Sequence, residues 1–351
     1  MIETQNELVT GTVLRASGAW YEVDVPAEQL AQVSLSQGEV PDKDVPEGVP
    51  AGHAILLCTL RGKLKLGKRE AAQPVSVGDQ VRVRPLSSFG PDARGRRLRE
   101  GYIEEVLPRR SSLGRSRYGK TNQITVANLD QAVIVMSLRE PELNTHRLDR
   151  FLVLAEASDL QAVICFNKCD LLRRREFKTE VEPLMKLYGG LGYIPLAVSA
   201  ETDTGIKEVR ATLAGHVSAM LGSSGVGKSS LVNAIQPGLH LWVGDVMDMG
   251  KGRHTTTEVS LHPLDSGGYI ADTPGIKTVT LLEQQEINLP QCFPEIARLA
   301  PECRFNNCTH IHEPGCAVRA AAESGAIAQA RYDSYLKMSN DEVLRPTNRN
   351  R

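Results

Sequence analysis

The stretch Gly222-Ser223-Ser224-Gly225-Val226-Gly227-Lys228-Ser229 decides the fold of this chain. It fits the pattern G-x4-G-K-[S/T], follows the apolar segment His216–Leu221 and opens the segment Lys228–Ile235, which has helical spacing. A glycine-rich turn between a strand and a helix presents backbone N–H groups and the positive end of the helix to an anion. The stretch therefore predicts a phosphate-binding loop, with Lys228 at the β- and γ-phosphates and Ser229 at Mg²⁺.

Strand-like and helix-like segments alternate around this loop, which predicts a parallel sheet with helical crossovers. We expect strands at Asp130–Leu138, Gln161–Phe166, Tyr193–Val198, His216–Leu221 and Tyr269–Ala271. We expect helices at Asn144–Ser158, Phe177–Tyr188, Gly205–Leu213, Lys228–Ile235 and, after the sheet, Ala317–Lys337, in which Gly325 is a weak point.

The stretch Asn167-Lys168-Cys169-Asp170 follows the strand Gln161–Phe166 and resembles the N-K-x-D motif of GTPases. A carboxylate accepts hydrogen bonds from the ring N–H and the exocyclic amine of guanine, a pair that adenine lacks, so Asp170 is expected to select the base. Asn167 is expected to contact the base and brace the phosphate loop, while the Lys168 stem packs over the purine. Ser199-Ala200, after the next strand, resembles the last GTPase box.

Two further boxes surround the γ-phosphate in this interpretation. Asp272-Thr-Pro-Gly275 resembles the D-x-x-G box, in which Asp272 holds Mg²⁺ through water and the Gly275 N–H senses the γ-phosphate. A threonine of the segment 250–257 is expected to close on Mg²⁺; Thr255, Thr256 and Thr257 all remain open, with Thr256 or Thr257 favoured. The expected GTP-binding residues are Asn167, Lys168, Cys169, Asp170, Ser199, Ala200, Gly222, Ser223, Ser224, Gly225, Val226, Gly227, Lys228, Ser229, Ser230, Thr256, Thr257, Asp272 and Gly275.

Ile276 stands where many GTPases carry a glutamine that orients the attacking water. An isoleucine cannot orient water, so intrinsic hydrolysis is expected to be slow and to need a partner. His254 is the candidate catalytic residue, because a near-neutral imidazole polarises water. The alternative is a surface histidine without a catalytic role.

The motifs run in an unusual order. The base motifs at 167 and 199 precede the phosphate loop at 222, the first switch near 255 and the D-x-x-G box at 272. This order predicts a circularly permuted domain, since the ends of a domain often lie close together. The chain leaves that domain just after the D-x-x-G box, so a nucleotide-driven change there is expected to act on the C-terminal residues.

A cysteine cluster lies in the last part of the chain, at Cys303, Cys308 and Cys316 around His310. Three thiolates and one imidazole fill a tetrahedral structural Zn²⁺ site without an open position. His312 is an alternative source of the imidazole. Buried cysteines with surface histidines are the alternative to a metal site.

The first hundred residues contain short strand-like segments separated by turns, which predicts a small β-barrel. Two basic clusters belong to this region or follow it: Arg61–Arg69, with five cations and no acid, and Arg94–Lys120, with nine cations and three glutamates. A barrel with basic residues at its rim suits binding to a nucleic-acid backbone. Few aromatic residues lie between these cations, so the sequence gives little support for stacking of bases on the protein. The alternative to a nucleic-acid-binding surface is a solvated charged surface.

The composition of the chain narrows the class of protein and its expected location. The 351 residues carry a formal net charge of -1, with 41% hydrophobic and 24% charged residues, which is ordinary globular composition. No apolar run reaches the length of a membrane-spanning helix, and the polar, acidic start of the chain does not resemble a secretory signal. We expect a cytoplasmic protein that does not contact membranes.

Taken together, the chain resembles the bacterial circularly permuted GTPases of the small ribosomal subunit, the YjeQ/RsgA family. The resemblance includes the barrel segment 58–65, Asn128-Leu-Asp130, Arg-His-Thr-Thr-Thr at 253–257, and Cys-Thr-His-x3-Pro-Gly-Cys at 308–316 with Glu313 before the proline.

The resemblance implies an N-terminal OB-fold β-barrel, a central circularly permuted α/β P-loop GTPase domain and a small, mostly helical zinc domain. We place them at 1–108, 109–285 and 286–351. It also implies GTP hydrolysis stimulated by the 30S subunit, contact with 16S rRNA, a role in late subunit maturation, and zinc ligands at Cys303, Cys308, His310 and Cys316. We expect a monomer with one structural Zn²⁺, and Mg²⁺ bound with GTP. The alternatives are an RNA-binding module with a slow nucleotide switch and a GTPase with another partner.

Overall fold

The computed structural model describes residues 8–33, 51–62, 75–92, 95–117, 120–239, 259–272 and 287–340. The chain divides into two compact units. The first unit comprises Met1–Asp130, Ala211–Ala219 and Gln236–Gly275, and the second comprises Gln131–Arg210, Met220–Ile235 and Ile276–Arg351.

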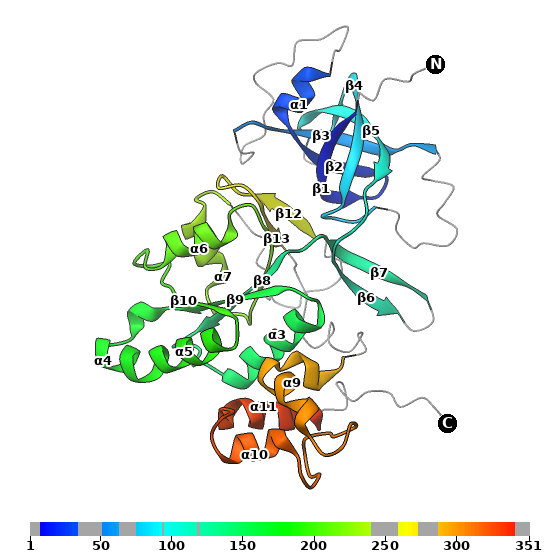
Figure 1. The fold of residues 1–351 in the computed structure, drawn as a ribbon. Helices are drawn as coiled ribbons and strands as arrows, with labels where there is room; N and C mark the ends of the chain where they lie inside the picture. The colour runs from blue at the N-terminus through cyan, green and yellow to red at the C-terminus, as the bar shows by residue number, and fades with distance from the viewer. Residues whose placement is uncertain are drawn as a thin grey trace, which may run out of the picture. The chain divides into compact units, whose positions relative to one another are not determined.

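The first unit contains a closed five-stranded barrel with the strand order β1-β2-β3-β5-β4 (Figure 1). Its strands are β1 (Val9–Ser17), β2 (Trp20–Pro26), β3 (His53–Leu60), β4 (Gln80–Pro91) and β5 (Arg97–Val106), with helix α1 (Ala27–Gln32) after β2. Alternate side chains fill the interior, among them Val13, Val23, Leu56 and Ile103, all 0% exposed. The barrel predicted from the spacing of short strands is confirmed.

Two features near the barrel were not predicted. Helix α1 is one, and the antiparallel hairpin of β6 (Ser112–Arg117) and β7 (Lys120–Ala127) is the other. Strand β6 falls inside the segment 94–120 that the sequence marks only as basic, and β7 begins at the last residue of that segment. The charges of the segment obscure the alternation on which a strand prediction depends.

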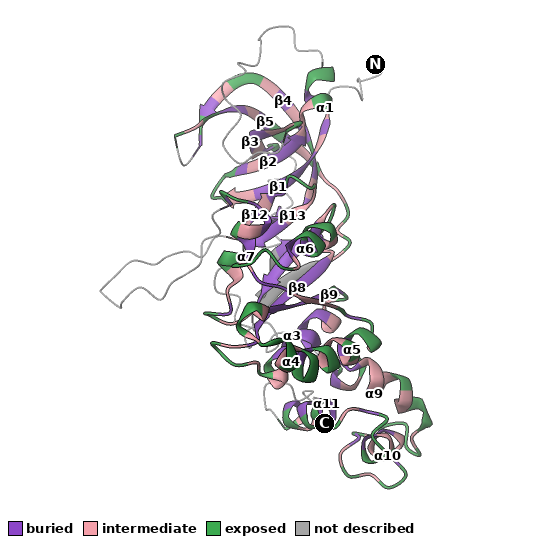
Figure 2. Ribbon diagram, turned by 90° about the vertical axis from the view of Figure 1, so that its left-hand side faces the viewer, coloured by how far each residue is buried: buried purple, intermediate pink, exposed green. Residues whose placement is uncertain are grey.

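A six-stranded sheet follows in the order β10-β9-β8-β11-β13-β12. Its strands are β8 (Gln131–Ser137), β9 (Gln161–Asn167), β10 (Ile194–Ala197), β11 (Val217–Leu221), β12 (Ser260–Pro263) and β13 (Tyr269–Asp272). The pairs β8–β9, β9–β10 and β11–β13 are parallel. Among the pairs whose register is described, only β12–β13 is antiparallel, and β12 was not predicted from the sequence. Every residue of β8 is buried, as expected of a strand covered on both faces (Figure 2).

The helices of the sheet are α3 (Thr145–Ala157), α4 (Arg174–Glu176), α5 (Glu182–Gly190), α6 (Ile206–Leu213) and α7 (Lys228–Ile235), with a 3₁₀ turn η3 (Cys169–Leu171). Asn144 caps α3, since its side chain accepts a hydrogen bond from the Arg147 N–H at 2.9 Å. The single helix predicted over Phe177–Tyr188 is wrong in detail. A π-turn, η4 (Phe177–Val181), precedes α5, because Pro183 at the start of α5 has no N–H to continue the earlier ladder.

The C-terminal segment, residues 287–340, is made of short helices: η5 (Leu289–Cys292), α9 (Pro294–Leu299), η6 (Ala300–Glu302), α10 (Ala317–Glu323) and α11 (Gln329–Ser339). The single helix predicted over Ala317–Lys337 is therefore two helices. Gly325, with φ at +79°, lies between them in the left-handed conformation that ends a helix.

Candidate functional site

The phosphate loop connects β11 to α7, and its glycines are required by the backbone. Gly222, Gly225 and Gly227 have φ values of +149°, +80° and +90°, which side chains other than that of glycine rarely allow. A Cβ on Gly222 would lie 2.5 Å from the carbonyl oxygen of Val135 in β8. The loop is thus seated directly against the neighbouring strand of the sheet, and α7 begins immediately after it.

Lys228, the first residue of α7, places its ammonium group inside this loop. Its Nζ donates to the carbonyl oxygens of Gly222 at 2.8 Å and Ser223 at 2.9 Å. Burial lowers the pKa of Lys228, since the surroundings solvate the charge poorly. A half-buried cation at the N-terminus of a helix is suited to an anionic ligand. Of the remaining predicted loop residues, Ser224, Ser229 and Ser230 are exposed.

The base-reading motif is joined to the phosphate loop by hydrogen bonds. The Asn167 side-chain N–H donates to the Val226 carbonyl oxygen at 2.8 Å, which is the bracing contact expected from the sequence. Lys168, in the left-handed conformation at φ +62°, donates through Nζ to the carbonyl oxygens of Gly225 at 3.1 Å and of Glu140. The Oδ1 atom of Asn167 is buried and has no hydrogen-bond partner among the described residues, so it is available to a ligand donor.

The last box lies next to the same motif. The Cys169 N–H donates to the Val198 carbonyl oxygen at 3.1 Å, which holds the two connections after β9 and β10 together. Ser199 is buried, and its Oγ accepts from the Thr202 N–H at 3.2 Å. Asp170 is exposed at the end of this group, where a base can reach its carboxylate. The structure thus brings together the predicted residues at 167–170, 199–200 and 222–230.

The other predicted nucleotide residues are placed less completely. Asp272 is the last residue of β13, paired with Ser260 of β12. His254, Thr256, Thr257 and Gly275 lie outside the described residues.

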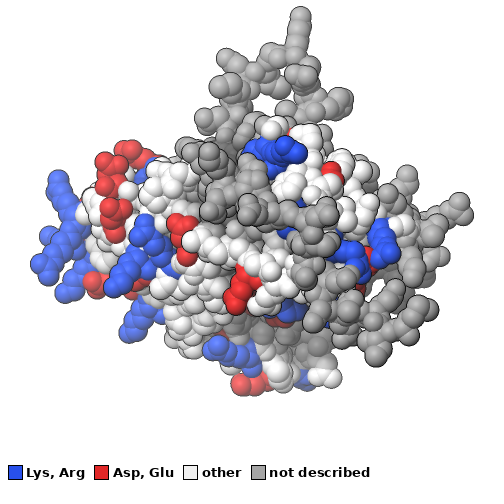
Figure 3. Space-filling view, turned by 90° about the horizontal axis from the view of Figure 1, so that it is seen from above, with Lys and Arg blue, Asp and Glu red and all other residues white. Residues whose placement is uncertain are grey.

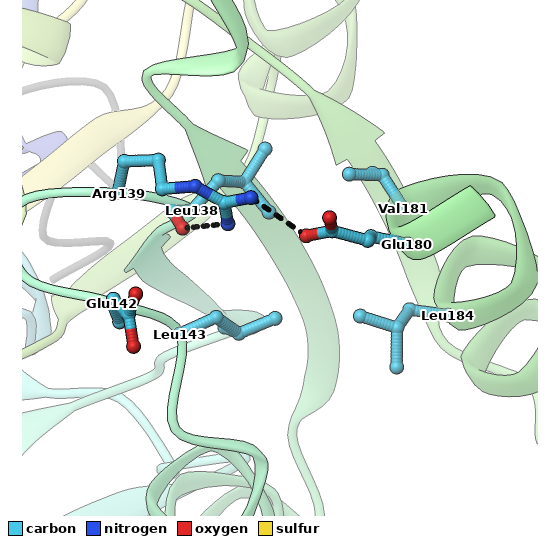
Figure 4. Close-up of a pocket in the computed structure, with 7 residues that line it drawn as sticks. All are labelled: Leu138, Arg139, Glu142, Leu143, Glu180, Val181 and Leu184. Atoms are coloured by element: carbon cyan, nitrogen blue, oxygen red, sulfur yellow. Dashed lines mark hydrogen bonds and ion pairs between the residues drawn. The ribbon is translucent and has the colours of Figure 1, made fainter. Parts of the chain in front are cut away.

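A separate cavity of about 320 Å³ lies in the second unit (Figure 4). Four aliphatic side chains line it together with Glu142 and the ion pair of Arg139 with Glu180, in which Arg139 Nη2 lies 2.8 Å from Glu180 Oε2. The aliphatic lining consists of Leu138, Leu143, Val181 and Leu184. None of the predicted nucleotide or metal residues contributes to it.

The four predicted metal ligands form a compact group. One ligand atom from each of Cys303, Cys308, His310 and Cys316 lies within 4.8 Å of all the others. The His310 Nδ1 atom is 3.5 Å from Cys303 Sγ and 3.6 Å from Cys316 Sγ, and these two sulfurs are 3.9 Å apart. A tetrahedron with ordinary Zn–S and Zn–N bonds has edges of about 3.5 to 3.8 Å. The donor set and its spacing therefore fit a zinc ion, and His312, the alternative imidazole, is not in the group.

Residues other than the four predicted ligands hold this metal loop in shape. Tyr332 and Tyr335 of α11 donate through their hydroxyls to the carbonyl oxygens of His310 and Thr309, each at 2.7 Å. The Glu313 carboxylate accepts from the N–H groups of Thr309 at 2.9 Å and His312 at 3.2 Å. Burial opposes ionisation of Glu313, but these hydrogen bonds outweigh it and lower the pKa of the carboxyl. The only sequence signal for Glu313 is its place inside the cysteine pattern.

Comparisons with known proteins agree with this geometry. The family model described as RsgA GTPase matches residues 106–282. The chain is 35% identical over 335 residues to "Small ribosomal subunit biogenesis GTPase RsgA 2" of Bacteroides thetaiotaomicron, covering 95% of this chain and 96% of that protein. It is 39% identical to the protein named "Small ribosomal subunit biogenesis GTPase RsgA" of Moorella thermoacetica, covering 95% and 98%.

Solved structures give the same result. YjeQ from Thermotoga maritima superposes with a TM-score of 0.65 at 35% identity, over 94% of this chain and 97% of that one. YloQ, described as a circularly permuted GTPase, superposes with a TM-score of 0.63 at 27% identity, over 96% of each chain.

The fold and the order of the motifs define a circularly permuted P-loop GTPase, an enzyme that hydrolyses GTP. Within that class, the chain belongs to the RsgA GTPase family. The family resemblance and permutation inferred from the sequence are confirmed. Among the described residues, no helix has the length and apolar character needed to span a membrane.

Proposed function

We propose that this GTPase acts in the maturation of the small ribosomal subunit, binding the 30S particle and 16S rRNA in its GTP state and hydrolysing GTP when the particle stimulates it. The nucleotide part rests on one observation, the hydrogen bond from Asn167 to Val226 that joins the base-reading motif to the phosphate loop. The ribosomal part rests on relatives that carry this role in their names and align along nearly the whole chain.

In this proposal Asp170 selects guanine, Ser199 and Ala200 complete the base site, and residues 222–230 surround the phosphates. Ser229 and Asp272, with Thr256 or Thr257, would hold Mg²⁺, which neutralises charge on the phosphates when it is bound. Cys303, Cys308, His310 and Cys316 would hold one structural Zn²⁺. We assign residues 1–108, 109–285 and 286–351 to the barrel, GTPase and zinc domains of a cytoplasmic monomer.

The barrel contributes two exposed aromatic side chains to the proposed RNA contact. Trp20 of β2 pairs with Thr59 of β3, and Thr59 pairs with Tyr102 of β5, so the three side chains share one row on the same face. Trp20 is 43% exposed and Tyr102 is 41% exposed. Two strand spacings separate the rings by about 10 Å. Arg84 of β4 lies opposite Tyr102, but its Nε atom is 3.0 Å from Glu104 Oε1, so its charge is paired within the barrel. The two exposed rings alone therefore support base stacking better than the sequence indicates.

The arginines of the basic cluster 94–120 contribute less to this surface than its charge count suggests. Arg109 makes two hydrogen bonds to the buried Asp79 carboxylate, at 2.6 and 2.7 Å. Arg96 pairs with Asp92 at 2.6 Å. On the face shown in Figure 3, described basic side chains lie next to acidic ones rather than forming one unbroken basic area.

Co-sedimentation with purified 30S subunits tests the proposal, using a non-hydrolysable GTP analogue, GDP or no nucleotide. We expect binding with the analogue and little with GDP, and a rise in GTP turnover when subunits are added. Trp20→Ala and Tyr102→Ala are expected to weaken binding, whereas Ile194→Ala, an exposed aliphatic residue on β10, serves as the control. Equal binding with GDP, or no binding at low salt, would contradict the proposal. Binding without stimulated turnover would favour an RNA-binding module with a slow switch.

A further inference from the structure

Arg331 of α11 is a buried cation with two carboxylate partners. Its side chain is 1% exposed, and its Nη1 atom lies 2.6 Å from Asp149 Oδ1. Its Nε and Nη2 atoms donate to the two oxygens of Glu295 at 2.7 and 3.2 Å. The guanidinium carbon lies 4.5 Å from the centre of the Phe293 ring. Such a fork fixes a side chain in one orientation more strictly than a single ion pair does.

The two carboxylates belong to different parts of the second unit. Glu295 is in α9, so its bond with Arg331 stays within the C-terminal segment. Asp149 is in α3, the helix that follows the central strand β8, and its side chain is 1% exposed. Figure 1 shows α3, α9 and α11 next to one another. The pair of Arg331 with Asp149 therefore joins the C-terminal segment to the sheet that carries the phosphate loop.

The Asp149 carboxylate uses only one of its two oxygens for its hydrogen bonds among the described residues. Its Oδ1 atom also accepts from the Tyr188 hydroxyl at 2.9 Å, while its Oδ2 atom is buried without a hydrogen-bond partner among the described residues. Desolvating a carboxylate in this way costs free energy, and removing the Arg331 guanidinium would leave a buried charge without this partner. Buried ion pairs contribute little net stability, so a positional role explains the arrangement better than a stabilising one.

The same helix also contacts the phosphate loop. Arg147, two residues before Asp149, donates through Nη1 to Ser223 Oγ at 3.3 Å. Two residues correspond to a rise of about 3 Å along a helix, so the two contacts belong to the same rigid turn. A shift of α11 that moves Asp149 must also move Arg147 relative to the loop.

We propose that Arg331 is a positioning residue for the nucleotide site. By holding Asp149 it sets the position of α3, and α3 sets the position of Arg147 at the phosphate loop. The affinity for the nucleotide then depends on how the C-terminal segment is held. Because coupling between two sites is reciprocal, nucleotide binding in turn stabilises the packing of α11 against α3. The inference rests on the proposed binding of GTP at this loop, and it provides a route separate from the D-x-x-G box.

The matched variants Asp149→Asn and Glu295→Gln test this inference. Each variant neutralises one carboxylate partner of Arg331, but only Asp149→Asn weakens the ion pair between α11 and α3. We expect Asp149→Asn to weaken GTP binding about fivefold or more, with Glu295→Gln close to the parent. Arg147→Met is expected to weaken binding similarly, and Arg147→Met with Asp149→Asn should not weaken it further, because both remove one connection. Arg331→Lys keeps the charge without the fork and should give a smaller effect than Asp149→Asn.

Hydrogen exchange of the α11 amides, with and without GTP, keeps the inference testable if a variant does not fold. We expect GTP to slow exchange over Gln329–Ser339 in the parent protein. If the parent binds GTP but Asp149→Asn binds it equally well, or if GTP leaves α11 exchange unchanged, the inference fails. If the parent protein binds no GTP, the proposed nucleotide site itself fails.

Discussion

The Asn167 side chain donates to the Val226 carbonyl oxygen across 59 positions of sequence, at a distance of 2.8 Å. One residue of the base-reading motif thus holds the phosphate loop at its midpoint. A ligand that spans both parts of the site meets a frame that is already assembled, which lowers the ordering cost of binding.

Replacing Gly227 with alanine tests this frame. A Cβ at this position would lie 2.4 Å from Asn167 Nδ2, and the φ value of +90° adds strain. We expect Gly227→Ala to lower GTP affinity by at least about tenfold in a fluorescent-nucleotide titration. Gly238→Ala is the control, because it has φ +84° but nothing within 4 Å of the added Cβ. That variant should lose about 1 kcal/mol of stability and keep its affinity; equal affinities in both variants would contradict the argument.

Base selection depends on the Asp170 carboxylate in the proposed site. An asparagine accepts from the ring N–H and donates to a carbonyl, which matches xanthine instead of guanine. We expect Asp170→Asn to lose GTP affinity by about two orders of magnitude and to gain affinity for XTP. Competition binding with both nucleotides measures the change, and ATP binding should stay negligible throughout. A variant that still prefers GTP would show that another group selects the base.

The metal group is tested by Cys308→Ser. We expect the parent protein to contain one zinc per chain and the variant to contain none, with a loss of stability on the order of several kcal/mol in the C-terminal segment. Elemental analysis and thermal unfolding provide the readouts, and a strong chelator should reproduce the effect in the parent. His312→Ala should retain the metal, since His312 is outside the group. Zinc loss in that variant would instead assign the imidazole to His312.

His254 lies outside the described residues, so its role is a prediction from sequence alone. We expect His254→Ala to bind GTP normally and to lose 30S-stimulated turnover by about a hundredfold. Single-turnover hydrolysis with and without subunits separates binding from chemistry. Unchanged stimulated turnover would rule out the catalytic role.

The Asp24 carboxylate is expected to make stability depend on pH. Its oxygens accept from the Tyr269 hydroxyl at 2.6 Å and lie 3.0 Å from His53 Nδ1. Burial raises the pKa of Asp24 despite these partners. A raised pKa means that the folded state holds the proton more tightly, so this contribution to stability is present at low pH and is lost as pH rises from about 4 through the folded pKa.

Urea unfolding of the parent and of Asp24→Asn between pH 4 and 7 measures this contribution. The difference in unfolding free energy, parent minus variant, is expected to fall as pH rises. A difference that stays constant or grows over this range would show that the carboxyl is ionised throughout.

Sequence reasoning succeeded where the chemistry is local. Gly222, Gly225 and Gly227 identify the phosphate loop in the sequence. The backbone conformation of the loop requires glycine at these positions, and all three lie within six residues of one another. Asn167 and the cysteine pattern are similar, since each motif occupies one short segment. The barrel and the parallel strands of the sheet followed from the same short-range pattern, whereas β12 did not.

Contacts between distant residues could not be predicted from one sequence. Arg331 bonds to Asp149, 182 positions away, and Tyr269 bonds to Asp24, 245 positions away. Nothing near Arg331 in the sequence distinguishes it from a solvated arginine, because its burial depends on how α3 and α11 pack. The sequence marked Gly325 as a weak point but still predicted one helix over Ala317–Lys337, because a single glycine only lowers helix propensity and does not by itself end a helix.

The circular permutation changes where the rest of the chain is attached. The chain enters the six-stranded sheet at β8 and leaves it after β13, and these are the two strands on either side of β11. A domain attached to an edge strand leaves the middle of a sheet undisturbed. Here the parts of the chain before and after the sheet are both connected to the strands that flank β11, the strand that ends in the phosphate loop. The connections to the rest of the chain are therefore made at the centre of the nucleotide-binding sheet and not at its edge.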